Sequence, residues 1–538
     1  MTVAFTSLAV VGVVVGQLSL KRMIGQRLEA EGLSWDASRS AVGQMQWKGV
    51  TGEAVEIGTL TVKLGWPIGV HLEGARIDLS EMDHWRSATA DGTTSWRPRW
   101  RAHADDLTLS WGEEILASSM RGPLHPNISL ANGDTAIEAA RNPRRGVVLA
   151  GRISGELPHP NLRGAGELEF QLGQTITFRL IAEGVQVDHP FVAEDPLPPQ
   201  PLSGAGVWDE DTGELSVRGA YGDVDWSIAG YATPERIGLN IAVPLTPLST
   251  VVDLFGSGIP EARRARISGE VSLGGRITGP DWSWVIEPGA KDLSVSNATP
   301  DTFGQPIVRW QTFDRTGCTE DSACEPDTVH HLTGPRTSGW VSLANAGWMA
   351  EAVIAAEDIR FRSHPGYDLL AIQEALANAQ ADERLRGGST LTQQLAKNLF
   401  LDGRRTLRRK LRELLLALSL EERMTKDAIL TLYLNVVEFG PGIWGIRDAA
   451  DAWFLKQPDQ LSVREAAFLA SILPAPRMWH QRITDSGRVP RTRVNGVLDR
   501  MRRRGSLSHA DHALATAETL RVVPPTSPLP GSDTSRQR

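Results

Sequence analysis

The chain reads Arg386-Gly387-Gly388-Ser389-Thr390-Leu391-Thr392-Gln393-Gln394-Leu395-Ala396-Lys397-Asn398 at the point where we expect a helix to begin. Thr390 and Gln393 have the spacing of a capping box, which predicts the helix start. Thr390, Gln394 and Lys397 recur at i, i+4 and i+7, so they share one face. A hydroxyl, an amide and an ammonium beside a glycine-rich helix N-terminus suit a ligand that carries phosphate or sugar. A capped surface helix with a solvated polar face is the alternative.

Length and composition narrow the class of protein. At 538 residues the chain exceeds one ordinary core, so two or three domains are expected. The net charge of −8 gives no general signal for nucleic acid, and no nucleic-acid partner is expected. Only eight lysines occur, and four of them are Lys397, Lys410, Lys426 and Lys456. This clustering indicates positions that require a compact ammonium group.

The two cysteines, Cys318 and Cys324, lie in one polar loop without a histidine or a second cysteine pair. This pattern argues against a zinc site. It favours a short-loop disulfide in an oxidising compartment, with two free thiols as the alternative.

The segment Val3–Leu20 is apolar and almost uncharged, and Lys21 and Arg22 follow it directly. Its length is about the minimum for a bilayer-spanning helix, roughly 17 residues. No small-x-small cleavage site follows, so we interpret residues 1–22 as an uncleaved transmembrane anchor, with the catalytic part on the periplasmic side of the inner membrane. The flanking cations oppose this orientation under the positive-inside rule, so either the true start lies upstream or the rule fails here. A buried helix is the alternative.

Residues 30–300 consist of short alternating segments, such as Gly166–Leu172 and Gly213–Arg218, separated by Gly, Pro, Asn and Asp. Arg152–Glu156 recurs identically as Arg266–Glu270. Repeated β units predict a β-rich extracytoplasmic region, built as a long curved sheet with one apolar face. In composition this region loosely resembles AsmA-like periplasmic proteins, whose β-grooves are associated with lipid handling, and the resemblance implies membrane lipid as a partner. A β-sandwich or barrel is the alternative.

The chain becomes helical after a predicted linker at 301–339. Helices are predicted at 348–356, 367–381, from 390 onward, and at 405–423, 426–435, 464–473 and 491–503. They form one predicted domain at 340–520. The tail at 521–538 is rich in Pro, Ser and Asp and is expected to be disordered.

Five motifs in the helical part occur in a fixed order. Glu357-Asp-Ile-Arg-Phe-Arg-Ser-His-Pro-Gly-Tyr-Asp368 is similar to the first motif of the family 51 glycosyltransferases, the peptidoglycan polymerases. Gly387–Asn398 matches their second motif nearly letter for letter, and Arg409–Glu413 matches the third. Lys426–Asn435 resembles the fourth motif, and Glu438–Lys456 the fifth. The chain therefore resembles monofunctional biosynthetic peptidoglycan transglycosylases and the glycosyltransferase domain of class A penicillin-binding proteins.

The resemblance implies a mostly α-helical, lysozyme-like domain that polymerises lipid II, a disaccharide-pentapeptide on undecaprenyl pyrophosphate, into glycan strands. It implies that Glu357 is the catalytic base and Glu413 the second essential carboxylate. Asp358, Phe361 and His364 would shape the acceptor region. The other residues expected to bind substrate are Ser389, Thr390, Gln394, Lys397, Asn398, Arg409 and Lys410. The implied partners are lipid II, the growing glycan strand and other proteins of cell-wall synthesis.

The chemistry of the reaction requires the same kinds of residue. Pyrophosphate is already a good leaving group, so one carboxylate must take the proton of the attacking sugar hydroxyl, and cations must stabilise the departing diphosphate. Glu357 suits the first role, and Lys397, Arg409 and Lys410 suit the second. Glu413 would either hold a divalent ion, Mg²⁺ or Mn²⁺, against the diphosphate or orient those cations. Direct displacement would invert the anomeric centre.

Departures from the family pattern are local. Thr431 stands where the family usually has Glu, and Leu455 where it usually has Gly. Neither Ser-x-x-Lys nor Lys-Thr-Gly occurs, so no transpeptidase activity is expected.

The predicted function is lipid II polymerisation at the envelope. The alternatives are a lipid-binding scaffold with an inactive glycosyltransferase domain and a glycan-cleaving enzyme on the same fold.

Overall fold

The computed structural model describes residues 44–51, 55–63, 68–78, 100–111, 114–123, 128–132, 135–142, 146–157, 161–172, 175–209, 212–233, 236–280, 282–300, 308–314, 327–382, 387–401 and 406–523. The predicted anchor at 1–22, the cysteine pair and the predicted disordered tail beyond 523 lie outside these ranges. Within them, no helix has both the length and the apolar character needed to cross a bilayer.

The chain divides into two compact units. The first comprises Met1–Thr246, Asp253–Gly256 and Val271–Gly289, and the second comprises Pro247–Val252, Ser257–Glu270 and Ala290–Arg538. The β-rich region followed by a helical C-terminal part agrees with the predicted fold class. The exact domain boundaries remain a prediction.

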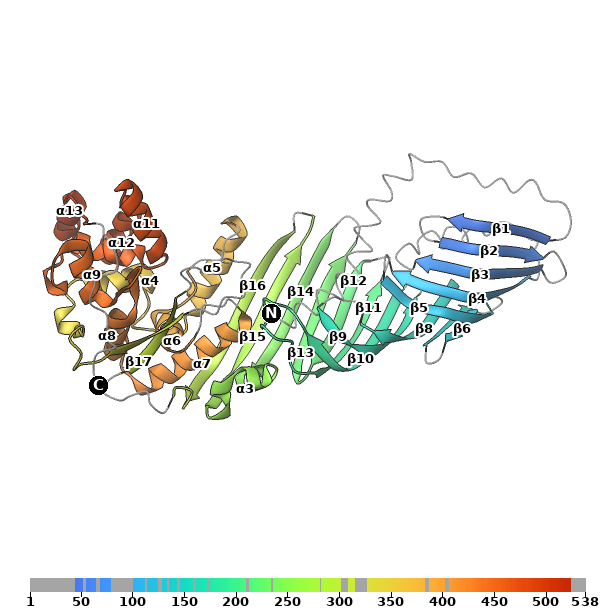
Figure 1. Ribbon diagram of the computed structural model, residues 1–538. Coiled ribbons are helices and arrows are strands. Elements are labelled where there is room, and N and C mark those ends of the chain that lie inside the picture. The colour runs from blue at the N-terminus through green and yellow to red at the C-terminus, as the bar shows by residue number, and fades with distance from the viewer. Residues whose placement is uncertain are drawn as a thin grey trace. The chain divides into compact units, whose positions relative to one another are not determined.

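The described strands up to residue 296 form one sixteen-stranded sheet in which each strand pairs with the next along the chain (Figure 1). β3 pairs with β4 in parallel, whereas β9 to β14 form an antiparallel meander. The strands are β1 (Gln44–Thr51), β2 (Val55–Lys63), β3 (Ile68–Asp78), β4 (Trp100–Trp111), β5 (Glu114–Pro123), β6 (Ile128–Asn132), β7 (Thr135–Asn142), β8 (Gly146–Glu156), β9 (Leu162–Leu172), β10 (Thr175–Val187), β11 (Gln200–Asp209), β12 (Glu214–Tyr221), β13 (Val224–Ala232), β14 (Ile237–Pro247), β15 (Arg266–Thr278) and β16 (Ser283–Ser296).

Burial alternates residue by residue along β11, β12 and the first half of β13, as the period-two sequence pattern predicts. The buried face includes Val217, Trp226 and Ile228. The buried Tyr221 Oη on β12 donates to the carbonyl of Val185 at 3.1 Å. At the β12–β13 turn Gly222 has a φ of 57°, which glycine adopts without strain.

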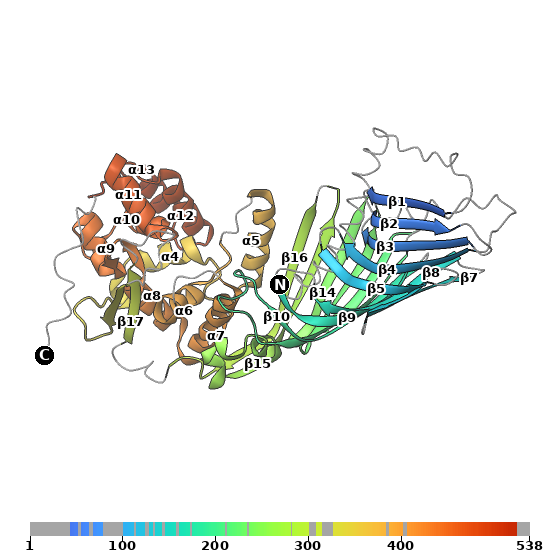
Figure 2. The ribbon, with the colours of Figure 1, turned by 45° about the vertical axis from the view of Figure 1, so that its right-hand side comes forward.

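The second unit is mainly helical (Figure 2). Its helices and short strands are α3 (Leu248–Asp253, which the boundary at residue 252 cuts), η2 (Gly256–Gly258), η3 (Pro260–Arg263), β17 (Val308–Asp314), β18 (Asp327–Thr333), η4 (Leu343–Asn345), α4 (Met349–Glu357), α5 (Leu369–Asp382), α6 (Leu391–Phe400), α7 (Leu407–Arg423), α8 (Lys426–Val436), β19 (Glu438–Gly440), β20 (Ile443–Trp444), α9 (Gly445–Phe454), η5 (Pro458–Gln460), α10 (Val463–Ile472), α11 (Pro476–Ser486), α12 (Arg491–Arg503) and α13 (His509–Ala517).

The hydrophobic core of this unit lies among α4, α6, α8, α9, α10 and α12. Its largest fully buried side chains include Trp453, Tyr433, Phe361 and Phe468. Local signals set the helix starts, because Thr390, Thr406, Thr425 and Ser462 each cap a helix through a side-chain oxygen. The capped starts explain why the predicted helices agree with the observed ones to within about two residues.

Several elements were not predicted. The β17–β18 hairpin lies in the expected linker, and β17 packs against α6. α9 begins at Gly445, which has a φ of 79°, inside a segment whose glycines indicated a loop. α11 and α13 were not predicted either.

Residues that precede the five motifs fix one face of α7 within the second unit. Arg412 donates to both carboxylate oxygens of Glu261, at 2.7 and 2.9 Å, and the Glu261 side chain is only 7% exposed. Farther along the helix, the backbone N–H of Ala298 donates to Ser419 Oγ at 3.2 Å. Arg423 donates to Thr299 Oγ1 at 2.7 Å. α7 therefore has a fixed rotation, which decides where its opposite face points.

Candidate active site

Glu357 is the last residue of α4, and its carboxylate is held by α6. Gln394 Nε2 donates to Glu357 Oε2 at 2.9 Å, and the Tyr433 hydroxyl donates to Gln394 Oε1 at 3.0 Å. Tyr433 is fully buried, so this chain of contacts fixes the amide and, through it, the carboxylate. The i, i+4 spacing of Thr390 and Gln394 helps to place the amide beside a helix 37 positions earlier in the chain.

The charge environment of Glu357 is suited to a base. Burial raises the pKa of its carboxyl group above the ordinary value, while the Gln394 hydrogen bond and the charges of Arg493, Lys397 and Arg500 oppose the rise. The net result is a pKa above the ordinary value, which makes the carboxylate a stronger base than a solvated one. The buried hydroxyl of Tyr433 has its pKa raised by burial and by the charges of Glu357 and Asp358, so it remains a hydrogen-bond donor.

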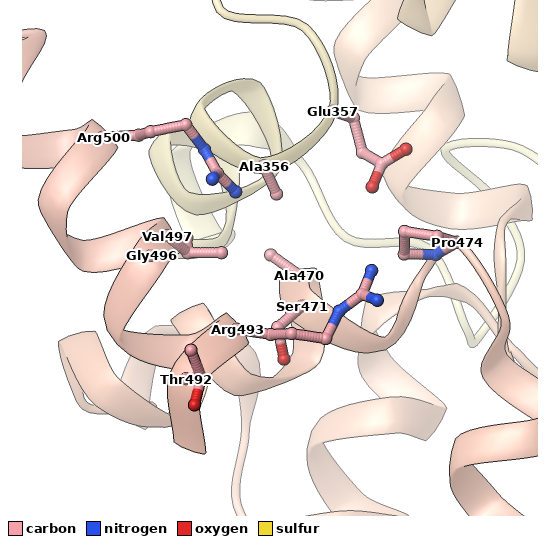
Figure 3. A pocket seen from close by; sticks show the side chains of 10 residues that line it. All are labelled: Ala356, Glu357, Ala470, Ser471, Pro474, Thr492, Arg493, Gly496, Val497 and Arg500. Carbon is pink, nitrogen blue, oxygen red and sulfur yellow. The ribbon is translucent and has the colours of Figure 1, made fainter. Parts of the chain in front are cut away.

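A cavity of about 230 Å³ borders Glu357, and none of its lining residues belongs to α6 (Figure 3). Its lining includes Ser471 and Pro474 from the end of α10 and Arg493 and Arg500 from α12. Figure 3 shows the two guanidinium groups directed into the space that the Glu357 carboxylate borders. The sequence reasoning predicted α12 but assigned no role to its arginines. The available signal was the arginine-rich composition of residues 482–504.

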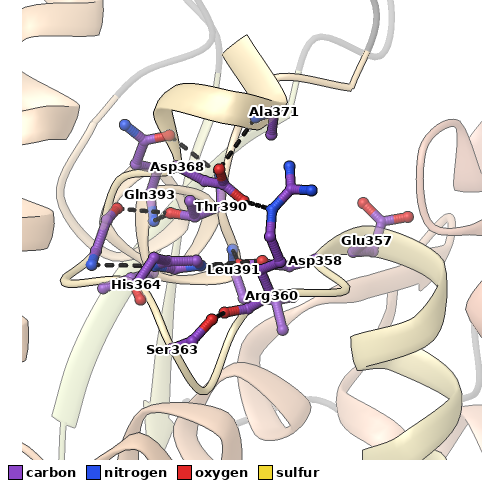
Figure 4. Close-up of polar contacts among 12 residues, drawn as sticks. Glu357, Asp358, Arg360, Ser363, His364, Asp368, Ala371, Thr390, Leu391 and Gln393 are labelled. Atoms are coloured by element: carbon purple, nitrogen blue, oxygen red, sulfur yellow. Dashed lines mark hydrogen bonds and ion pairs between the residues drawn. The ribbon is translucent and has the colours of Figure 1, made fainter. Parts of the chain in front are cut away.

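Asp358 and His364 form a buried pair that connects the loop after α4 with the start of α6 (Figure 4). His364 Nε2 lies 2.9 Å from both carboxylate oxygens of Asp358. The N–H of Gly366 donates to His364 Nδ1 at 3.1 Å, and the N–H of Leu391 donates to Asp358 Oδ2 at 2.8 Å. Nδ1 accepts, so Nε2 carries the proton. These contacts give both residues a positioning role.

Phe361 and Lys426 support the same loop, the one that follows α4. Phe361 is fully buried, and the Lys426 ammonium lies 4.6 Å from the centre of its ring. Lys426 also donates to the carbonyl of His364 at 2.6 Å and to Glu421 at 2.7 Å. Farther along, Arg360 donates to Asp368 at 2.6 Å (Figure 4). The first motif is thus built largely to hold the loop that follows Glu357.

Thr390 has a different place from the one that its spacing suggested. It is only 2% exposed, its hydroxyl donates to the carbonyl of Gly366 at 2.7 Å, and it accepts from the N–H of Gln393 at 3.2 Å. Gln393 Oε1 completes the predicted capping box. With its hydrogen committed to Gly366, the hydroxyl serves the helix cap, and on the predicted polar face Gln394 is half-buried and Lys397 is exposed.

Glu413 lies on the opposite end of the site and is held by two cations. Its carboxylate, buried to 3% exposure, accepts from Arg409 Nη1 and, at 2.7 Å, from Lys410 Nζ. Lys410 also donates to Ser389 Oγ at 2.6 Å, which connects α7 to the residue just before α6. Burial, together with the positive charges of Arg409 and Lys397, lowers the pKa of Lys410 to about 8.

Lys397 connects the two ends of the site electrostatically. Its side chain is exposed, and its charge acts on both Glu357 and Lys410. Asn398, the next residue, is half-buried. Lys397 of α6 therefore acts on both carboxylate sites, because its charge affects Glu357 and also Lys410, which binds Glu413.

A divalent ion would need several oxygen ligands from the protein. Across the described ranges, no group of three or more His, Cys, Asp or Glu side chains gathers in a way that could hold a metal. Both oxygens of Glu413 already accept from cations. The donors present do not fit a protein-held Mg²⁺ or Mn²⁺ ion, and these contacts favour the role of Glu413 in orienting Arg409 and Lys410.

Comparisons with known proteins fall on this part of the chain. A family model described as Transglycosylase matches residues 327–502. Proteins named biosynthetic peptidoglycan transglycosylase from Salmonella enteritidis PT4 (strain P125109) and Salmonella typhi are 49% and 48% identical over 174 residues, which cover 32% of this chain and 71% of each relative. A crystal structure of penicillin-binding protein 1A from Haemophilus influenzae matches 40% of this chain and 21% of its own at 18% identity, with a TM-score of 0.20.

Proposed function

The chain belongs to the biosynthetic peptidoglycan transglycosylase family, and from this membership we propose that it is a peptidoglycan glycosyltransferase that polymerises lipid II into glycan strands and releases undecaprenyl pyrophosphate. The observation that supports the proposal best is the placement of Glu357. Its carboxylate is fixed by Gln394, borders a cavity, and interacts electrostatically with Lys397, whose charge also acts on Lys410 beside Glu413.

In the proposed reaction, the 4-hydroxyl of one sugar attacks the anomeric carbon of another. Glu357 takes the hydroxyl proton while the new carbon–oxygen bond forms, and the bond from the anomeric carbon to the diphosphate oxygen breaks with its electron pair. A single displacement of this kind inverts the anomeric centre. The raised pKa of Glu357 makes its carboxylate a stronger base than a solvated one.

The diphosphate leaves with negative charge that the protein must stabilise. Lys397, Lys410 and Arg409 supply three positive charges at one end of the site. Glu413 holds Lys410 and Arg409 in fixed positions, so they need little reorganisation when charge develops on the leaving group. We assign charge neutralisation to these side chains.

We also propose that the protein acts at the periplasmic face of the inner membrane. Support comes from the apolar segment Val3–Leu20 and from a substrate that carries a long lipid. Membrane lipid, bound by the β-rich region, and other cell-wall synthesis proteins remain proposed partners. A topology reporter fused to the C-terminus, active only when exported, tests the orientation. Reporter activity supports this orientation, and an expressed but inactive fusion contradicts it.

The activity is tested with purified full-length protein and fluorescently labelled lipid II in detergent. We expect long glycan that a muramidase digests, together with release of undecaprenyl pyrophosphate. Binding of lipid II without polymer would instead support the scaffold function. Soluble fragments released from finished glycan would support cleavage.

A further inference from the structure

A second cavity lies next to the one at Glu357 in the same unit. Its volume is about 620 Å³, within the usual range of ligand sites. It is bounded by the end of α11, the turn at residues 486–490 and the start of α12. Thr492 and Arg493 line both cavities, so the second one adjoins the first. A molecule that occupied both cavities would place one part at Glu357 and another part in the second cavity.

The charge of this second cavity is entirely positive. Four arginines line it, at positions 482, 488, 491 and 493, and its lining contains no acidic residue. Over the part of the chain that the structure describes, none of these four guanidinium groups forms a salt bridge. Neighbours on the same helices do, because Arg477 pairs with Glu438 and Arg504 pairs with Glu351. The nearby Asp485 accepts instead from Gln481.

One wall of the cavity is an aromatic ring that holds arginines in place. The guanidinium carbons of Arg482 and Arg493 lie 5.4 and 5.7 Å from the centre of the Trp479 ring. The indole N–H of Trp479 is buried and has no hydrogen-bond partner among the described residues. The ring restricts the motion of Arg482 and Arg493, and the planar donor forks of all four arginines match a carboxylate.

We propose that this cavity binds the free carboxylates of the peptide that the glycan precursor carries, and the proposal rests on the proposed function. Arg488 and Arg491 would contact the carboxylates, and Trp479 would cover one side of the peptide. The hydroxyl-donating substrate would be held through its peptide while its sugar lies at Glu357. The cavity would then favour precursors with ionised peptides, which makes it a specificity site apart from the diphosphate cations.

The test compares two substrates and three proteins, all full-length and in detergent. The substrates are lipid II with its native peptide and lipid II with the peptide carboxylates converted to amides. The proteins are the wild type, the double variant Arg488→Gln/Arg491→Gln, and the control Arg503→Gln. Arg503 is an exposed arginine on α12 that lines neither cavity.

For the double variant on native lipid II we expect KM to rise about tenfold, equivalent to about 1.4 kcal/mol, with kcat within about twofold. Wild type on the amidated substrate should show a similar rise in KM. The double variant on that substrate should show no further rise, because the lost contact is the same. Arg503→Gln should behave as wild type on both substrates.

Three results would overturn the proposal. The first is an unchanged KM for the double variant on native lipid II. The second is a further rise in the KM of the double variant on the amidated substrate, equal to the rise that its substitutions cause on native lipid II. The third is a double variant that no longer binds phosphatidylglycerol vesicles but keeps the wild-type KM in detergent. That result would assign the arginines to lipid headgroups.

Calorimetry separates failure of this proposal from failure of the proposed function, because it needs no turnover. The probe is the water-soluble disaccharide-pentapeptide without lipid or diphosphate. We expect wild type to bind it about tenfold more tightly than its amide, and the double variant to show no such preference. Equal binding of both probes by wild type would contradict the peptide site even if polymerisation is active.

Discussion

Replacement of Gln394 by Leu should shift the acid limb of the pH–rate profile upward. The amide of Gln394 donates to Glu357 at 2.9 Å and opposes the rise in pKa that burial causes. Leu has a similar size and no donor, so the ionised form of Glu357 loses its hydrogen bond. A base acts only when ionised, so activity appears as pH rises through its pKa. Raising that pKa therefore moves the limb to higher pH.

The size of the shift follows from the geometry. A hydrogen bond to a charged group contributes about 1.5–3 kcal/mol, and the half-buried carboxylate places the loss at the lower end of this range. About 1.4 kcal/mol corresponds to one pKa unit, so the limb of kcat/KM should move by about one pH unit. Because kcat/KM reports the free enzyme, the comparison is made at subsaturating lipid II.

Replacement of Gln394 also affects Tyr433, and a matched control variant separates the two effects. Gln394→Leu also leaves the buried hydroxyl of Tyr433 without its acceptor, which costs about 1–3 kcal/mol of stability. Tyr433→Phe keeps the bond between Gln394 and Glu357, so its limb should stay within about 0.3 pH unit of wild type. The double variant Gln394→Leu/Tyr433→Phe should recover stability and keep the shifted limb. An acid limb that stays in place in both Gln394 variants would refute the assignment of that limb to Glu357.

Three further outcomes are expected. Lys410→Arg should move the alkaline limb of kcat/KM from about pH 8 to above about pH 10, because the Lys410 ammonium, whose pKa is about 8, loses its proton as pH rises, whereas arginine stays charged. Glu261→Gln should lower the free energy of unfolding, measured with urea, by about 1–3 kcal/mol, because Arg412 loses its buried partner. Leu455→Gly should raise the same free energy by about 0.5–1 kcal/mol, since Leu455 has a φ of 55° at the end of α9. The Lys410 prediction is contradicted if the alkaline limb does not move in Lys410→Arg. The Glu261 prediction is contradicted by an unchanged urea midpoint for Glu261→Gln, and the Leu455 prediction by a lowered urea midpoint for Leu455→Gly.

Local signals in the sequence predicted the parts of the fold that local chemistry determines. The capping box at Thr390 and Gln393 is present, and period-two burial runs along β11 and β12. The family departure at Leu455 also has a physical meaning, because that position requires a left-handed conformation that glycine adopts without strain. α9 was missed because the glycines before it were interpreted as a loop, although Gly445 only sets the turn into the helix.

The candidate site depends on contacts that spacing cannot reveal. Helical periodicity placed Thr390 on a ligand-facing surface, yet its hydroxyl is used by the cap and by Gly366. The arginines of α12 lie more than a hundred positions after Glu357 in the chain, so only tertiary packing brings Arg493 and Arg500 to it. The contact of Glu261 with α7 likewise joins residues 151 positions apart. No local pattern in the sequence encodes these pairs.

Whether Glu357 is the base can be measured by comparing wild type with Glu357→Gln on labelled lipid II, recording both the polymer formed and the lipid II bound. The variant keeps the size of the side chain and removes its basicity. We predict binding within about threefold of wild type and a loss of about 10²–10⁴-fold in polymerisation rate. Polymerisation by Glu357→Gln at more than about a tenth of the wild-type rate would contradict the role of this carboxylate, because that loss would lie below the range expected for a general base.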